Sequence, residues 1–160
     1  MKKESIGTAL ALRYLKCDSI DSLDQRILLQ KKLYLAQACG ANFGHRFHWY
    51  IHGPYSKDLT NVAYEVIPQA DEELDGYKLR GNITQILDNI NRLSTIKPDT
   101  LTESSWYELI ASLVYLREDY GIEGLKNKRD VITKLKVSKP WYEKNEIEMA
   151  WKIGETICNG

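Results

Sequence analysis

The chain has 160 residues, of which 43% are hydrophobic and 28% are charged, and this balance suits one compact globular domain over residues 1–160. Because 22 basic residues balance 22 acidic ones, a uniformly basic nucleic-acid-binding surface is excluded. No run approaches the roughly 18 apolar residues that a membrane-spanning helix needs. Three cysteines without a CxxC pair predict neither a disulfide framework nor a zinc site. We therefore expect a soluble, cytoplasmic protein with reduced thiols.

Helical spacing of apolar residues dominates the chain from end to end. Ser, Asp and Thr at the starts of the periodic segments, and Gly or Pro at their ends, mark the helix boundaries. Helices are expected over residues 6–16, 22–40, 56–67, 83–93 and 102–121, around 131–135, and over 143–157, with a strand over 47–52. The sequence thus predicts a mainly α fold of about seven helices, with at most a small two-stranded β-ribbon, in a single compact domain.

The expected strand, residues 47–52, is rich in aromatic residues and ends at Gly53-Pro54. Residues 76–79 are a candidate partner strand, which would make the ribbon a β-wing. Alternation along the strand places Phe47, Trp49 and Ile51 toward the core. The outward row would then be His48, Tyr50 and His52.

Three histidines, His45, His48 and His52, lie within eight residues. On a helix their spacing would place all three on one face, as metal ligands require. On a strand, His48 and His52 are about 13 Å apart and cannot share one ion. Because Gly53-Pro54 follows directly, the strand is favoured, and neither a metal nor another cofactor is predicted.

Nucleophilic catalysis is also not favoured. Cys39 is expected at the C-terminal end of its helix, where the helix dipole opposes a thiolate. Ser56 precedes a helical segment, so its position is typical of a helix N-cap. No catalytic residue is therefore predicted.

Basic residues gather over residues 126–139, where Asp130 is the one acidic residue among them. Such a run is either a solvated face or a phosphate-contacting patch. The run comprises Lys126, Lys128, Arg129, Lys134, Lys136 and Lys139.

The alternative function is that of a winged-helix-like nucleic-acid-binding regulator. Either the helix that holds Arg26, Lys31 and Lys32 or the helix after Ser56 would then enter a groove of the nucleic acid. The latter helix is poorly equipped to contact phosphates, because it has one lysine and two acidic residues.

Four segments carry a family resemblance. The first, ILLQKKLYLAQACG (27–40), resembles the "KLQKLLYLAQ" helix of Panacea-type (SocA-like) antitoxin domains and of the related YwgA-like proteins. The second, FHWYIHGPYSKDL (47–59), resembles their aromatic strand, Gly-Pro turn and helix. WYELIASLVYL (106–116) and KPWYEKNEIEMAW (139–151) are similar to the YwgA-like branch. Lys32 departs from the pattern, because the family helix usually has an apolar residue there, and this predicts a more exposed face.

The resemblance implies a non-enzymatic protein-interaction module, antitoxin-like or associated with phage defence, whose partner is a toxin or a defence component. The partner site would lie around the aromatic strand and its turn, since Trp and Tyr are favoured at interfaces. The candidate contact residues are His48, Tyr50, His52, Tyr55 and Lys32.

Overall fold

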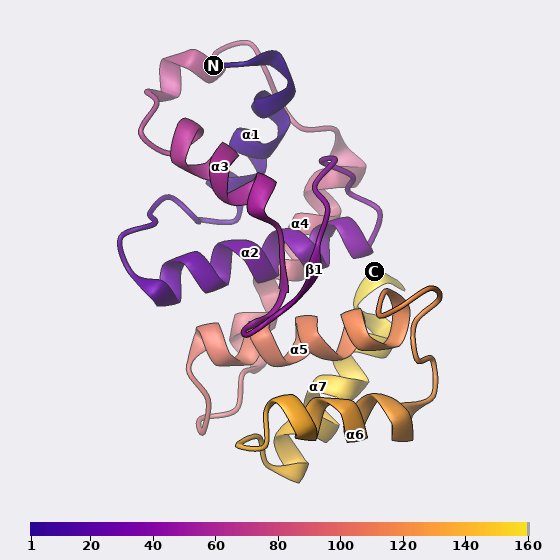
Figure 1. The fold of residues 1–160 in the computed structure, drawn as a ribbon. Coiled ribbons are helices and arrows are strands. Elements are labelled where there is room, and N and C mark those ends of the chain that lie inside the picture. Colours follow the sequence, from indigo (N-terminus) through magenta and orange to yellow (C-terminus); the bar gives the residue numbers. More distant parts are fainter. Residues whose placement is uncertain (160) are drawn as a thin grey trace.

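The computed structural model describes residues 1–159, which form seven α-helices and one two-stranded sheet (Figure 1). The helices are α1 (Ile6–Tyr14), α2 (Leu23–Ala38), α3 (Lys57–Val66), α4 (Gly81–Arg92), α5 (Glu103–Glu118), α6 (Lys128–Ser138) and α7 (Lys144–Thr156). The strands are β1 (His48–Tyr50) and β2 (Gly53–Tyr55), and short 3-10 helices lie at η1 (Lys3–Ser5), η2 (Asp71–Leu74), η3 (Leu93–Ile96) and η4 (Ile157–Asn159). The mainly α fold with a small ribbon is therefore confirmed.

Helix α5 lies at the centre of the core because it has almost no polar face. Every residue over 106–116 is buried. Helix α2 packs on one side of α5, and α6 and α7 pack on the other (Figure 1). Although α5 is so apolar, no helix in the described part of the chain is both long and apolar enough to cross a membrane.

The two largest buried side chains of α5 also tie it to α4. Trp106 donates its indole N–H to the Leu93 carbonyl at 2.8 Å, and the Tyr107 hydroxyl donates to the Ile90 carbonyl at 2.6 Å. Both rings are fully buried, so these bonds satisfy polar atoms that would otherwise lack a partner.

Side-chain caps begin two of the helices that position the site. The Ser22 hydroxyl accepts from the Gln25 backbone N–H, and the Gln25 side chain accepts from the Ser22 N–H, which is a capping box. The Ser56 hydroxyl accepts from the Leu59 N–H at 3.1 Å and starts α3. The predicted cap at Ser56 is confirmed, and Ser56 is a structural residue.

The ribbon differs from the prediction in its second strand. β1 pairs with β2 in an antiparallel register that sets Tyr50 opposite Gly53, so Ile51 and His52 form a two-residue turn. Residues 76–79 form no strand, and the β-wing prediction is wrong because Gly53, with φ +88°, lets the chain turn back at once.

The turn also makes one prediction wrong, namely that Ile51 faces the core. Phe47 and Trp49 pack against the core as expected. Ile51 is instead 84% exposed, because it lies at the tip of the hairpin and strand alternation does not apply there.

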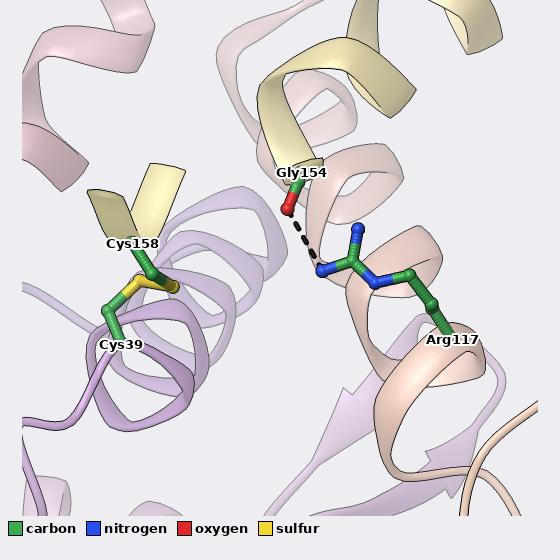
Figure 2. Close-up of a disulfide and its surroundings, with 4 residues drawn as sticks. All are labelled: Cys39, Arg117, Gly154 and Cys158. Carbon is green, nitrogen blue, oxygen red and sulfur yellow. Dashed lines mark hydrogen bonds between the residues drawn. A yellow bond between two sulfur atoms is a disulfide. The ribbon is translucent and has the colours of Figure 1, made fainter. Parts of the chain in front are cut away.

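The prediction of reduced cysteines is wrong for one pair. Cys39, the C-cap of α2, is joined by a disulfide to Cys158 in η4 (Figure 2). The fold brings the end of the chain back to α2 across 119 residues, a pairing that no local motif reveals. Nearby, Arg117 of α5 donates to the Gly154 carbonyl of α7 at 3.0 Å (Figure 2). Cys17 is a free, buried thiol.

Candidate protein-interaction site

The hairpin formed by β1 and β2 packs between α2 and α5, since β2 contacts both helices. Gly53 is buried, and a Cβ atom placed on it would lie 2.4 Å from the Ser112 hydroxyl of α5. Only glycine combines the positive φ with this close approach. The first residue of β2 therefore seats the hairpin on α5.

Two buried lysines hold the carbonyl groups of the hairpin. Lys31 of α2 donates from Nζ to the Pro54 carbonyl at 2.7 Å, and Lys139, the C-cap of α6, donates to the Ile51 carbonyl at 2.7 Å. Lys31 is 1% exposed and Lys139 is fully buried. Because a buried ammonium loses its hydration, these carbonyl groups replace part of the lost solvent.

Glu108 of α5 supplies the carboxylate of this cluster. Its Oε2 lies 3.4 Å from Lys139 Nζ and accepts from the Tyr142 hydroxyl at 3.2 Å, while Oε1 lies 3.2 Å from His52 Nδ1. This buried carboxylate thus contacts Lys139 and His52 directly and acts on Lys31 through its charge alone. Burial lowers the pKa of Lys31 to about 7 and also lowers the pKa of Lys139.

Exposed apolar side chains gather above this cluster. Tyr50, Ile51 and Trp141 are 52%, 84% and 62% exposed, and His52 of the same turn is half exposed. Lys139 Nζ lies 5.6 Å from the Trp141 ring while it holds the Ile51 carbonyl, so the hairpin tip and the α6–α7 loop adjoin (Figure 1). We name Tyr50, Ile51, His52 and Trp141 the hairpin patch.

A pocket of about 240 Å³ opens beside the patch, between α2, α3 and the hairpin. Its walls are largely apolar and include Ile20, Ile27 and Ala63. Lys31 and His52 also line it, so the pocket joins the buried charge cluster to the hairpin patch.

Four of the five predicted contact residues lie together on the hairpin. His48 and Tyr50 are exposed, and His52 is half exposed. Tyr55 is partly buried and lines the pocket, where its hydroxyl accepts from the Thr60 hydroxyl at 2.9 Å.

Lys32 does not belong to this site, and its predicted exposure is wrong. It is 7% exposed, donates to the Leu15 carbonyl at 3.3 Å and lies 3.5 Å from Glu103. Adjacent residues on a helix point in different directions, so Lys31 faces the hairpin while Lys32 faces away from it.

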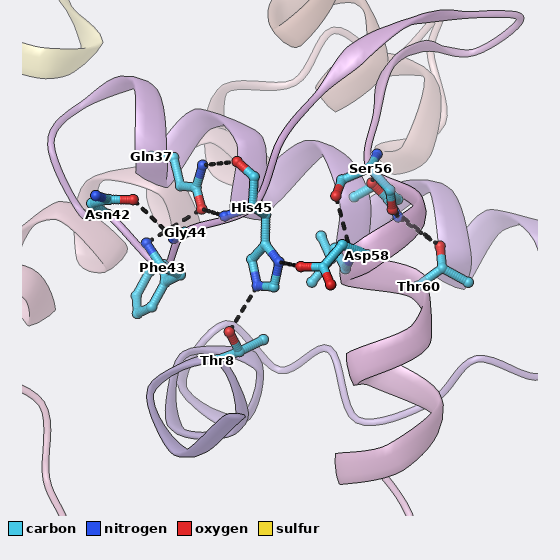
Figure 3. A network of polar contacts seen from close by, with 11 residues as sticks. Thr8, Gln37, Asn42, Phe43, Gly44, His45, Ser56, Asp58 and Thr60 are labelled. Carbon is cyan, nitrogen blue, oxygen red and sulfur yellow. Dashed lines mark hydrogen bonds and ion pairs between the residues drawn. The ribbon is translucent and has the colours of Figure 1, made fainter. Parts of the chain in front are cut away.

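His45 takes part in a separate polar network (Figure 3). Its Nδ1 lies 2.7 Å from the Asp58 carboxylate and its Nε2 lies 2.8 Å from the Thr8 hydroxyl. Gln37 holds the His45 backbone through its N–H and its carbonyl. Thr8 is only 1% exposed, so a substrate cannot reach this hydroxyl, and the network joins α1, α2 and α3 structurally.

The histidines do not form a metal centre. His45 points toward α1 and α3 (Figure 3), whereas His52 contacts Glu108. Within residues 1–159, no three His, Cys, Asp or Glu side chains are grouped to hold a metal ion.

The basic run 126–139 is partly neutralised by acidic neighbours. Lys126 lies 2.6 Å from Glu118, and Lys128 lies 2.8 Å from Glu148. These lysines lower the pKa of Glu118 and Glu148 through hydrogen bonds. The remaining candidates for phosphate contact are Arg129 and Lys136, which are exposed, and Lys134, which lies over the Tyr120 ring.

The proposed use of Lys31 and Lys32 in a nucleic-acid groove is wrong, because both side chains are buried. Neither ammonium lies on an outer surface that a nucleic-acid backbone could contact. The alternative of a nucleic-acid-binding regulator thus loses two of its three candidate contacts on α2.

Sequence reasoning missed the roles of Lys31, Lys139 and Glu108. A weak signal was present at Glu108, which interrupts an otherwise apolar helical segment. Charged residues are almost never fully buried unless they are paired, so such interruptions indicate either an exposed face or a buried cluster. Periodicity alone cannot separate the two.

Comparisons of the chain with protein-family models, with curated proteins and with solved structures find no match. No function can therefore be taken over from a relative, and the similarity to Panacea-type domains stays a resemblance in sequence pattern.

Proposed function

We propose that this chain is a non-enzymatic protein-interaction module, of the antitoxin-like type that its sequence pattern resembles, and that the hairpin patch binds its partner. The observation that carries the proposal is the pairing of Ile51, 84% exposed, with Trp141, 62% exposed, around one buried ammonium. Grouped exposed apolar side chains are typical of interaction sites, and Trp and Tyr are enriched among interface anchors.

The fixed position of the patch supports binding further. Lys139 holds the Ile51 carbonyl, and Gly53 seats the hairpin against Ser112. The Tyr50 ring meets the Tyr55 ring edge-on, with centroids 5.3 Å apart. A patch that is ordered before binding loses little conformational entropy when the partner arrives.

The surroundings of two nucleophilic side chains also favour binding over catalysis. The Thr8 hydroxyl beside His45 is buried, and Cys39 is bonded to Cys158. Following the family resemblance, we expect the partner to be a toxin or a defence component.

The test is capture of the partner from the organism that encodes the chain, with quantitative mass spectrometry. Ile51→Asp and Trp141→Ala should each reduce capture of one protein at least about tenfold, as interface anchors do. Val137→Asp is the matched control, because Val137 is 75% exposed on α6 outside the patch. Undiminished capture by both patch variants would overturn the proposal.

The antitoxin-like character needs a second measurement. The captured protein should inhibit growth when it is expressed alone, and co-expression of the native chain should relieve that inhibition. Trp141→Ala should not relieve it. A captured protein that leaves growth unaffected would refute the antitoxin assignment but not the binding role.

A further inference from the structure

The pocket beside the hairpin patch combines apolar walls with charged side chains that are all basic. The charged or basic side chains that line it are Arg26, Lys31 and His52, and no acidic side chain does so. Such a site favours an occupant that has an apolar body and a negative charge.

Lys31 is a buried basic group without a direct ion-pair partner in the described part of the chain. Glu108, the nearby carboxylate, is already engaged by Lys139, His52 and Tyr142. Among the ion pairs found within residues 1–159, none includes Lys31. Its ammonium has the Pro54 carbonyl as its hydrogen-bond acceptor, and a buried charge without a counter-charge is costly.

The size and position of the pocket narrow the choice of occupant. Its volume of about 240 Å³ is below the roughly 300 Å³ at which pockets for whole small-molecule ligands begin. His52 lines the pocket and also belongs to the hairpin patch, so the pocket is continuous with the proposed interface. One residue of the partner chain fits both observations.

We propose that the pocket binds the C-terminal residue of the partner protein, with its apolar side chain between α2 and α3 and its free carboxylate toward Lys31 and Arg26. A terminal residue supplies the apolar body and the charge together, and capture of a C-terminal carboxylate is a known mode of peptide recognition. The inference rests on the proposed function, because it takes the partner to be a protein that contacts the hairpin patch.

The assignment predicts that binding depends on pH through Lys31. Its pKa of about 7 reflects burial, and a bound carboxylate would favour the protonated ammonium. Glu108 and Lys139 face the same cluster, and His52 and Arg26 line the pocket with Lys31. The carboxylate should therefore bind more tightly at pH 6 than at pH 8.5.

The experiment uses fluorescein-labelled peptides of one fixed Gly-Ser body that end in Leu, Phe or Ser, each as the free acid and as the amide. We expect the Leu or Phe acid to bind with a dissociation constant at least about tenfold lower than its amide, as a charge-assisted contact predicts. The Ser acid should bind more weakly than the Leu acid.

Substitutions in the pocket test which side chains contact the peptide carboxylate. Lys31→Met should remove the preference for the acid, and Lys32→Met is the matched control, since it removes a buried lysine from the opposite side of α2. Arg26→Gln, at a partly buried position, should weaken the acid preference even if Lys31→Met fails to fold. Circular dichroism confirms the fold of each variant.

Equal affinity for acid and amide, or an unchanged acid preference in Lys31→Met and Arg26→Gln, would overturn the inference. If partner capture still depends on Ile51 and Trp141 in either case, the proposed protein-interaction function stands.

Discussion

At the scale of single residues, Lys31 and Lys32 show how one position along a helix changes a side chain's role. Both are buried in α2. Lys31 bonds to the Pro54 carbonyl of the hairpin, whereas Lys32 bonds to the Leu15 carbonyl after α1. Glu103 lies 3.5 Å from Lys32 and pairs with it, whereas Lys31 takes part in none of the ion pairs found within residues 1–159.

The pH dependence of stability follows from Lys31. Its pKa is about 7 in the folded chain and about 10.4 in the unfolded chain. Between these values the unfolded chain holds a proton that the folded chain has lost, so the free energy of unfolding rises with pH. From pH 7 to 8.5, the native chain should gain between about 1 and 2 kcal/mol relative to Lys31→Met, measured by urea unfolding.

Comparison with Lys31→Met cancels the contributions that other titratable groups make to the pH dependence of stability. Burial lowers the pKa of Lys139 as well, but both chains contain this lysine. Burial raises the pKa of the Cys17 thiol to about 11, which lowers stability above the ordinary cysteine pKa and is also common to both. Parallel stability profiles for the native chain and Lys31→Met would contradict the prediction.

At the scale of elements, the hairpin depends on Gly53. Its φ is +88°, and an added Cβ would lie 2.4 Å from the Ser112 hydroxyl. Gly53→Ala should therefore lower the free energy of unfolding by about 2–3 kcal/mol, through backbone strain and steric overlap together. Urea unfolding followed by Trp fluorescence gives the value.

Two further variants separate strain from overlap. Gly76 has a similar φ of +84° but open space around it, so Gly76→Ala should cost only about 1 kcal/mol. The buried Ser112 hydroxyl lacks a hydrogen-bond partner within residues 1–159, so Ser112→Ala should be nearly neutral alone. It should also restore part of the loss in the Gly53→Ala background, and a strictly additive double variant would rule out the overlap.

Local signals explain which elements the sequence could predict. The start of α2 at Ser22 and the start of α3 at Ser56 are set by side chains within three residues, so both were predictable. The partner of β1 was not, because a two-residue turn with Ile51 and His52 lacks the usual Asn-Gly or Gly-rich signal.

The candidate site was predictable only in part. The exposure of Tyr50 and of His52 follows from their place on a short hairpin. The burial of Lys31 depends on where β2 packs, and the burial of Lys139 depends on its bond to the Ile51 carbonyl. Such contacts between distant segments leave no periodic pattern in the sequence.

At the scale of the whole molecule, α5 separates two groups of helices that the chain must hold together. Helix α2 packs on one side, and α6 and α7 on the other (Figure 1). The disulfide between Cys39 and Cys158 spans this arrangement, because it joins the end of α2 to η4, which follows α7 (Figure 2). It closes a loop of 119 residues.

Reduction of this disulfide should lower the free energy of unfolding substantially. Cross-linking restricts the unfolded chain, and a loop of this length corresponds to an upper value of about 5 kcal/mol. Urea unfolding with and without a phosphine reductant measures the difference, and Cys39→Ser should match the reduced chain and be insensitive to the reductant. Ile157 of η4 is buried, so the folded chain should keep its helical circular dichroism after reduction. Equal stability of the oxidised and reduced chains would mean that packing of η4 alone holds the C-terminal segment against α2.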